Sequence, residues 1–278
     1  MPDLLVLTTN SQNFFKLEEL TKKGALRVKA SADFEITKGW LKTKAFDALL
    51  LDDSTTPEQQ RVLATLLWNL NPEASLICVV LGDNSEQHIA EAKLLGAEVL
   101  EGKTALNDLA TLLSKVELVS RKKKHTQLNF LVIEDLDSPR DIICFYVESL
   151  GFGSVKGLAS AKEALTELDT NHAPNTCIIT DIRMPHMSGK ELISAIRSHK
   201  KHQHIPIIAL TAYGTVDTLV DCLKAGASGF LVKPPKKDDL VREIARAIRI
   251  INKRSSPRLA SQNEAEMIRK ILEDKGFA

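Results

Sequence analysis

The sequence predicts an α/β protein built from two units of alternating strands and helices, with a parallel sheet in each. Short apolar runs rich in Val, Ile and Leu occur along both halves of the chain, and segments of helical periodicity separate them. Strands joined by helices run parallel, with right-handed crossovers. Several of the apolar runs also end abruptly in acidic residues, as at Asp181. The carboxyl ends of parallel strands are where such sheets bind ligands, so the acids mark a candidate site.

The composition is that of an ordinary globular protein of about two domains. The chain has 278 residues, of which 44% are hydrophobic and 26% charged, and its formal net charge is +1. This balance gives no reason to expect nucleic acid or a membrane as a direct partner, and no apolar run is long enough to span a bilayer. The sequence lacks a secretion signal and its four cysteines are widely separated, so we expect a cytoplasmic protein.

The first predicted domain covers residues 1–120 and contains four clear strand patterns. These apolar runs occupy residues 4–7, 46–51, 76–81 and 98–100. Four helices are predicted in this domain. The first begins at Asn10 or Ser11, the second begins at Thr56-Pro57, and the third ends near Leu95. The fourth runs from about Thr104 to Val119. The domain carries 17 acidic and 12 basic side chains, which favours a contact surface.

A basic run, Arg121 to His125, follows and is interpreted as part of a linker over residues 121–127. A nucleic-acid patch is the alternative, but no aromatic or further basic cluster accompanies the run. The second predicted domain covers residues 128–253. Residues 254–278 are predicted to be a short helical tail, which is too short for a core of its own or a DNA-binding output domain.

Helix starts are clear in the second domain. Caps are predicted at Ser138-Pro139, Ser160 and Ser188, the last two as capping boxes with Glu163 and Glu191. Three histidines, His199, His202 and His204, could suggest a metal-binding tract; they are interpreted as a solvated helix end and loop.

Four strand ends of the second domain carry polar residues that suit one site. Glu134 and Asp135 follow the run 131–133, Asp181 follows 177–180, Thr211 follows 207–210 and Lys233 follows 230–232. Asp181 comes 46 residues after Asp135, Thr211 comes 30 after Asp181, and Lys233 comes 22 after Thr211. Because parallel strands bring such ends to one crevice, the expected site holds three acids, a hydroxyl and an amine. This set suits a divalent metal and a phosphoryl group.

With these motifs in this order, residues 128–252 resemble the receiver domain of bacterial two-component response regulators. The resemblance implies a flavodoxin-like (βα)5 fold whose five parallel strands have the order 2-1-3-4-5. It implies that Asp181 accepts a phosphoryl group from a sensor histidine kinase or a phosphotransfer protein. It also implies that Lys233 neutralises the phosphoryl oxygens and that Thr211 and Phe230 form a switch. Glu134, Asp135, Asp181 and the backbone carbonyl of Arg183 would hold Mg²⁺.

The first half is interpreted as a degenerate copy of this fold, a pseudo-receiver. Its Leu95-Gly96-Ala97 followed by Lys103 matches Ala225-Gly226-Ala227 followed by Lys233. Thr8 and Thr9 replace the metal-binding acids, and both Asp52 and Asp53 remain candidates for the acceptor position. Two hydroxyls and one carboxylate are a poor ligand set for Mg²⁺, so we expect no phosphorylation of this domain.

The leading hypothesis is therefore a phosphorylatable receiver, preceded by a pseudo-receiver, that switches contacts with a downstream protein partner. It would catalyse only its own phosphoryl transfer and autodephosphorylation. The alternative is the regulatory region of a longer signalling enzyme, a cyclic-dinucleotide synthase or phosphodiesterase, truncated after residue 278. A homodimer through the second domain is also predicted, with a mixed-charge helix face exposing Arg242, Glu243, Arg246 and Arg249.

Overall fold

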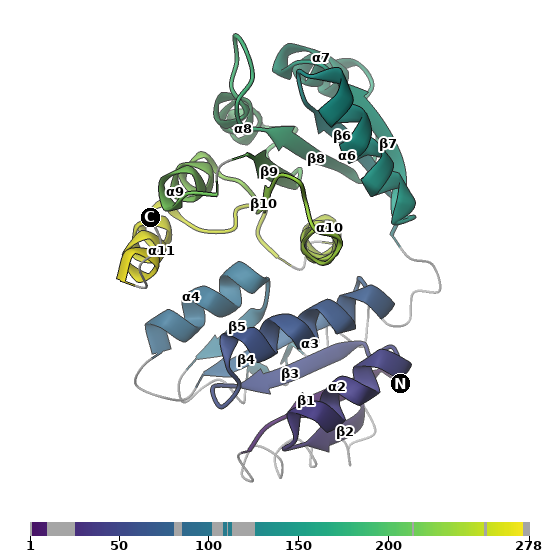
Figure 1. The fold of residues 1–278 in the computed structure, drawn as a ribbon, viewed down its shortest axis with the longest axis vertical. Coiled ribbons are helices and arrows are strands. Elements are labelled where there is room, and N and C mark those ends of the chain that lie inside the picture. The colour runs from purple at the N-terminus through teal and green to yellow at the C-terminus, as the bar shows by residue number, and fades with distance from the viewer. Residues whose placement is uncertain are drawn as a thin grey trace. The chain divides into compact units, whose positions relative to one another are not determined.

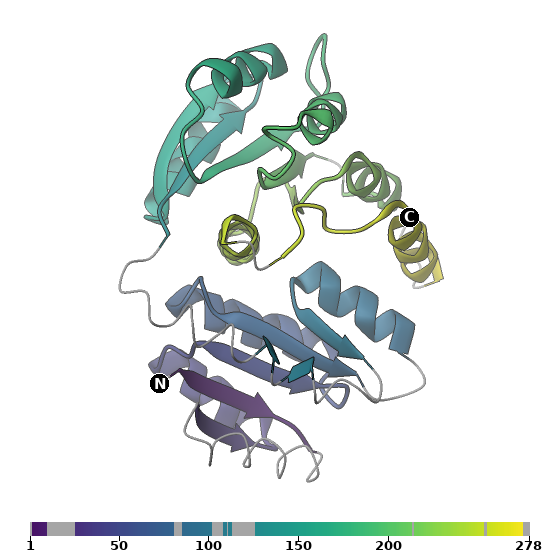
Figure 2. The ribbon, with the colours of Figure 1, turned by 180° about the vertical axis from the view of Figure 1, so that it is seen from behind.

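The chain divides into two compact units, residues 1–125 and 126–278 (Figures 1 and 2). The computed structural model describes residues 2–9, 26–80, 85–101, 108–109, 111–112, 126–212, 214–252 and 255–274. Among the helices formed by these residues, none is both long and apolar enough to cross a lipid bilayer.

The first unit contains a five-stranded parallel sheet in the order β2-β1-β3-β4-β5. Its strands are β1 (Asp3–Leu7), β2 (Arg27–Ser31), β3 (Ala48–Asp52), β4 (Ser75–Val80) and β5 (Glu98–Glu101). Three helices, α2 (Phe34–Thr43), α3 (Pro57–Leu70) and α4 (Ser85–Leu95), lie next to one another. The helix expected from Asn10 lies outside the described residues, as does most of the helix expected from Thr104.

The second unit repeats this topology, with the order β10-β9-β8-β6-β7. Its strands are β6 (Leu128–Ile133), β7 (Gly153–Leu158), β8 (Thr176–Asp181), β9 (Ile207–Thr211) and β10 (Gly229–Val232). Its helices are α6 (Asp137–Ser149), α7 (Ala161–Thr170), α8 (Gly189–Ser198), α9 (Val216–Ala225), α10 (Lys237–Ile251) and α11 (Gln262–Asp274). In each unit the first strand lies between the second and the third, and all the pairs are parallel. The predicted fold class, with strand order 2-1-3-4-5, is thereby confirmed.

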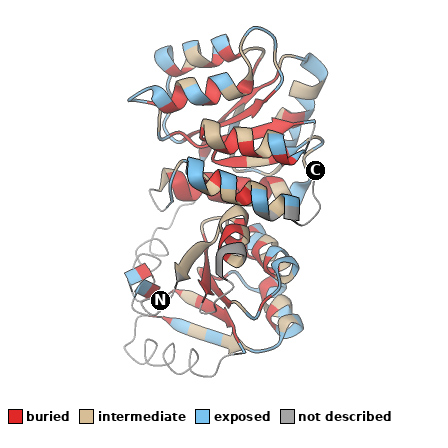
Figure 3. Ribbon diagram, turned by 90° about the vertical axis from the view of Figure 1, so that its left-hand side faces the viewer, coloured by how far each residue is buried: buried red, intermediate tan, exposed pale blue. Residues whose placement is uncertain are grey.

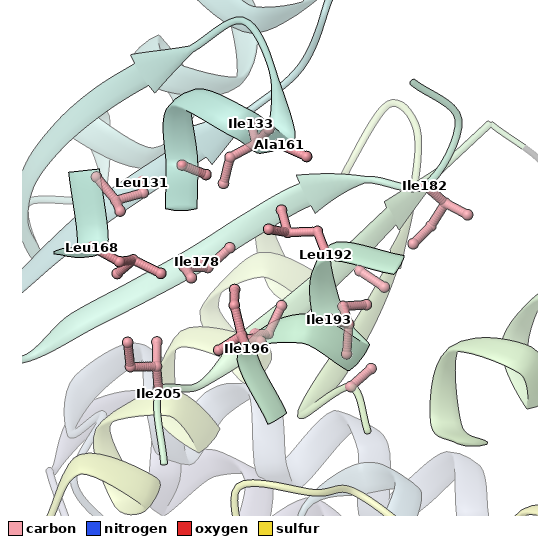
Figure 4. Close-up of a cluster of buried hydrophobic side chains, with 14 of the residues drawn as sticks. Leu131, Ile133, Ala161, Leu168, Ile178, Ile182, Leu192, Ile193, Ile196 and Ile205 are labelled. Carbon is pink, nitrogen blue, oxygen red and sulfur yellow. The ribbon is translucent and has the colours of Figure 1, made fainter. Parts of the chain in front are cut away.

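Helices cover both faces of the second sheet, which explains why its central strands are apolar throughout. On one face, side chains of α7, α8 and α9 pack on the sheet in a cluster that includes Leu168, Ile178 and Ile196 (Figure 4). On the other face, α6 and α10 contribute Val147 and Ile244 to a second cluster. Helices α6 and α7 carry buried residues on one side and exposed residues on the other (Figure 3).

Most of the predicted helix starts are confirmed. Ser188 and Glu191 form a capping box at α8, and Ser160 accepts the amide of Glu163 at α7. The cap predicted at Ser138 is wrong, because α6 begins one residue earlier at Asp137 with no side-chain cap bond.

The tail helix α11 packs against α9 within the second unit. Ala265 and Ile268 are buried, while Lys224 of α9 pairs with Glu266 and Arg269 pairs with Asp217 of α9. The tail is therefore docked on the second unit.

The mixed-charge face expected on α10 is not exposed. Glu243, Arg246 and Arg249 are all buried. Arg246 Nη1 donates to Glu243 Oε2 at 2.8 Å and to the carbonyl oxygen of Ser228 at 3.2 Å. Glu243 fits closely over Gly229, where a Cβ atom would come within 2.1 Å of its Oε2. Glu243 and Arg246 are thus bonded inside the unit, so the prediction that they are exposed on this face is wrong, while the homodimer stays a prediction.

Candidate functional site

The sheet order brings the predicted site residues to neighbouring strand ends. Asp181 is the last residue of β8 and Thr211 the last of β9, while Lys233 directly follows β10. Glu134 and Asp135 directly follow β6, which pairs with β8. The carboxyl ends of these four strands therefore collect every polar side chain that the sequence analysis assigned to the site.

The amine of Lys233 contacts two of the three acids. Its Nζ lies 2.5 Å from Glu134 Oε2 and 3.1 Å from Asp181 Oδ1. Carboxylate oxygens of Glu134, Asp135 and Asp181 lie within 4.8 Å of one another. Three hard carboxylate oxygens so close together are a donor set that fits Mg²⁺, which prefers oxygen ligands. The residues present therefore fit the metal that the receiver resemblance implies.

The charge balance of this cluster is uneven, because one amine faces three acids. Burial raises the pKa of Glu134 above its ordinary value, and the negative charges of Asp181 and Asp135 add to the rise. The hydrogen bond and the positive charge of Lys233 lower it. A further cation would relieve the remaining repulsion among the acids.

Backbone contacts hold the acids in place. The amide of Ile182 donates to Asp181 Oδ1 at 2.8 Å, and Arg140 Nη1 donates to the carbonyl oxygen of Glu134 at 2.9 Å. Gly189, the first residue of α8, lies so close that a Cβ atom would come within 2.0 Å of the Asp181 carbonyl oxygen. Neither Arg140 nor the close approach of Gly189 was predicted from the sequence. The only sequence signal for Gly189 was its position directly after the cap Ser188.

The switch candidates occupy neighbouring strands. Thr211 is buried, and its carbonyl oxygen accepts the amide of Lys233 at 2.7 Å. Phe230, in β10, is half-buried and packs against the cluster shown in Figure 4. The Lys233–Pro234 peptide bond is cis.

An open pocket of about 650 Å³ adjoins the acids. Its lining includes Asp135, Arg183 and Lys190. Lys190 of α8 forms an ion pair with Asp221 of α9, with Nζ and Oδ2 2.8 Å apart. The pocket opens the acidic cluster to solvent.

In the first unit, different side chains surround the strand end that is equivalent to the position of Asp181. Asp52 is the last residue of β3, as Asp181 is of β8, so strand position assigns Asp52 rather than Asp53 as the counterpart. Asp52 is buried and accepts hydrogen bonds from the hydroxyls of Thr8 and Ser54. Thr9 is exposed. Lys103 lies outside the described residues. Among the described residues of this unit, no group of acids, histidines or cysteines has the spacing of a metal site.

Known proteins resemble the second unit. A sequence profile of the family described as response regulator receiver domain matches residues 130–245. Chemotaxis protein CheY1 of Helicobacter pylori is 36% identical over 107 residues, which are 38% of this chain and 86% of CheY1. Luminescence regulatory protein LuxO of Vibrio campbellii is 32% identical over 118 residues, 42% of this chain. The match spans only 25% of LuxO.

Among solved structures, a response regulator receiver domain protein from Clostridium thermocellum aligns with 44% of this chain and 94% of its own, at 31% identity and a TM-score of 0.40. The matched residues 130–245 include the acidic pair, the acid at the end of β8, the hydroxyl of β9 and the lysine after β10. Through its second unit, the chain belongs to the response regulator receiver family.

Proposed function

We propose that the chain is a response regulator whose second unit is phosphorylated on Asp181 and whose first unit is an unphosphorylated pseudo-receiver. The observation that carries the proposal is the contact of Lys233 with both Glu134 and Asp181 beside a third acid, Asp135. This arrangement places a nucleophilic carboxylate, a fixed ammonium group and metal-binding oxygens at one edge of the sheet. The phosphoryl donor would be a sensor histidine kinase or a phosphotransfer protein of a phosphorelay.

In the proposed reaction, a carboxylate oxygen of Asp181 attacks the phosphorus of a phosphohistidine. A P–O bond forms, the P–N bond breaks, and the imidazole leaves with the bonding electron pair and takes up a proton. Glu134, Asp135, Asp181 and the carbonyl of Arg183 would hold Mg²⁺, which supplies positive charge against the repulsion between carboxylate and phosphoryl oxygens. Lys233 supplies a second positive charge, already fixed 3.1 Å from Asp181 before the donor arrives.

The output is proposed to be a change of protein contacts, so the chain acts as a signalling module and not on a separate substrate. Thr211 would turn its hydroxyl toward a phosphoryl oxygen, and Phe230 would move further into the space that Thr211 leaves. Both residues lie in strands next to α9 and α10, so movement there would reach the surface that a downstream protein partner contacts. The protein is proposed to act in the cytoplasm, where its four cysteines would remain thiols.

The first unit is proposed to give a constant contact surface. Both oxygens of the Asp52 carboxylate already accept hydroxyl groups, from Thr8 and Ser54. A hydroxyl in place of an acid at Thr8 also removes negative charge that Mg²⁺ would need.

Incubation with acetyl phosphate and Mg²⁺ tests the proposal. Intact-mass measurement should show one added phosphoryl group in the wild type and in Asp52→Asn, and none in Asp181→Asn. Asp52→Asn is the matched control because it changes the same chemical group at the same strand position of the other unit. Label that persists in Asp181→Asn and disappears in Asp52→Asn would reverse the assignment of the two units.

A further inference from the structure

A second group of metal-ligand side chains lies at the opposite edge of the second sheet. Asp169 is near the end of α7, His199 caps the end of α8, and His202 lies in the loop before β9. Helix ends and the strand starts that follow them lie away from the carboxyl ends of the strands, so this group is separate from the phosphorylation site.

The three side chains come within coordinating range of one another. The Asp169 carboxylate and one ring nitrogen from each of His199 and His202 all lie within 4.8 Å of one another. His202 Nε2 is 3.3 Å from Asp169 Oδ1. A third imidazole, His172, is adjacent, with its ring centroid 5.1 Å from that of His202. Segments more than 25 residues apart in sequence thus bring three imidazoles and a carboxylate together.

The burial of His202 makes this more than a surface tract of histidines. His202 is only 5% exposed, although the sequence analysis placed it in a solvated loop. Its Nδ1 is buried and, among the described residues, has no hydrogen-bond partner. An unsatisfied buried polar atom costs about 1–3 kcal/mol, so the ring of His202 has a nitrogen whose bonding capacity the described residues do not use.

The neighbouring groups are suited to a metal. His199 is exposed and its ring stacks on that of His202, with centroids 4.4 Å apart and planes 14° apart. Parallel rings point their lone pairs in parallel directions, so binding would turn the exposed ring of His199 while the buried ring of His202 stays in place.

We propose that Asp169, His199 and His202, with His172 beside them, form a binding site for a borderline divalent transition metal of the zinc class. Imidazole and carboxylate ligands are the donor set of such ions, whereas Mg²⁺ prefers oxygen alone. Asp169 either ligates the ion directly or accepts the Nε2 proton of His202 and orients its ring, an arrangement common beside metal-bound histidines. The bound ion would join the end of α7 to the loop that leads into β9.

Zinc titration of the untagged full chain tests the proposal. Calorimetry with Zn²⁺, in excess Mg²⁺ so that the acidic cluster is occupied, should show one site per chain. His199→Gln and Asp169→Asn should each weaken zinc binding by about tenfold or more, and zinc should raise the melting temperature of the wild type more than that of either variant. Both residues are exposed, so the variants are expected to fold even if substitution of the buried His202 prevents folding.

Matched controls separate this site from other zinc ligands. His204→Gln removes an exposed histidine of the same tract, Asp135→Asn alters the phosphorylation site, and Cys144→Ser removes the half-exposed thiol; all three should bind zinc as the wild type does. The proposal is overturned if zinc shows no saturable binding. It is also overturned if His199→Gln and Asp169→Asn keep wild-type affinity, or if a control variant loses as much. The zinc titration does not measure phosphorylation of Asp181. Its result is therefore independent of the acetyl phosphate experiment that tests the proposed function.

Discussion

Lys233 Nζ lies 3.1 Å from Asp181 Oδ1 and also contacts Glu134, so one ammonium group serves two acids while a third, Asp135, lies alongside. Two consequences follow. The metal-free site contains more negative than positive charge, so repulsion among the acids lowers the stability of the folded unit. A bound cation would raise the stability of the folded unit, because its positive charge would offset the repulsion among the acids that ligate it.

We predict that Asp135→Asn stabilises the metal-free protein and abolishes its stabilisation by Mg²⁺. Removing one of the three acids reduces repulsion, by on the order of 1 kcal/mol for a half-buried charge. Urea denaturation followed by far-UV circular dichroism should show a higher midpoint for the variant without Mg²⁺ and a higher midpoint for the wild type with Mg²⁺. Asp141→Asn, on the exposed side of α6, is the control and should change neither. A lower midpoint of Asp135→Asn in metal-free buffer would contradict the prediction.

The sequence was sufficient for the central strands and for the acids of the site, because both have local signatures. Strands covered on both faces are continuous apolar runs, and the acids come directly after them. The strands β2 and β7 gave no such signal. Both lie at sheet edges and are mostly exposed or half-exposed, and β7 contains Lys156 and two glycines. Five strands in each domain were expected from the resemblance, but neither β2 nor β7 was located from the sequence.

The features that the sequence analysis missed depend on contacts between distant segments. The ring of His202 lies against those of His172 and His199, and its Nε2 is 3.3 Å from Asp169, 33 residues earlier. Glu243 of α10 fits over Gly229 and pairs with Arg246. Charge patterns along a helix predict exposure only when no neighbouring segment offers a partner, and the sequence does not reveal such a partner.

We predict that Gly189→Ala destabilises the second unit by about 1–3 kcal/mol, a typical cost of overpacking. The added methyl group would meet the Asp181 carbonyl oxygen at 2.0 Å, so α8 must move away from the end of β8. In urea denaturation followed by far-UV circular dichroism, Gly189→Ala should lose structure at a lower urea concentration than the wild type. Its phosphorylation by acetyl phosphate should also be slower. Both tryptophans, Trp40 and Trp68, lie in the first unit, so their fluorescence provides an internal reference.

Gly39→Ala is the matched control for this glycine. A Cβ atom at Gly39, inside α2, meets nothing within 4 Å, so the same substitution should stabilise its helix by roughly 0.5–1 kcal/mol. The tryptophan transition should therefore move to higher urea in Gly39→Ala and stay unchanged in Gly189→Ala. Equal effects of the two substitutions would show that close approach to Asp181 does not matter.

Thiol reactivity should follow burial. Burial raises the pKa of Cys78 and of Cys222 to about 12 and also raises that of Cys144, which is half-exposed. A thiol whose folded pKa lies above its ordinary value of 9.0 contributes stability that is fully present below pH 9.0 and is lost as pH rises toward 12. At about pH 8, iodoacetamide should therefore alkylate Cys144 first and leave Cys78, Cys177 and Cys222 unmodified until urea unfolds their units. Peptide mass spectrometry measures the order, and alkylation of Cys222 as fast as Cys144 in the folded chain would refute it.

The last prediction concerns the contact between α11 and α9. Ile268→Asp should detach α11 while the second sheet stays folded, because a carboxylate replaces an isoleucine that is only 4% exposed. Hydrogen exchange should then accelerate across residues 216–225 of α9 and across α11, and remain slow in β8 and β9. Lys270→Ala is the control, since Lys270 is exposed on the same helix. The two ion pairs, Lys224–Glu266 and Arg269–Asp217, lie at the surface and contribute little to stability alone. Hydrogen exchange in the Glu266→Gln variant should therefore stay near that of the wild type. Unchanged hydrogen exchange in Ile268→Asp would mean that the packing of α11 does not stabilise α9. Faster exchange throughout the unit would mean that α11 is part of the unit's core.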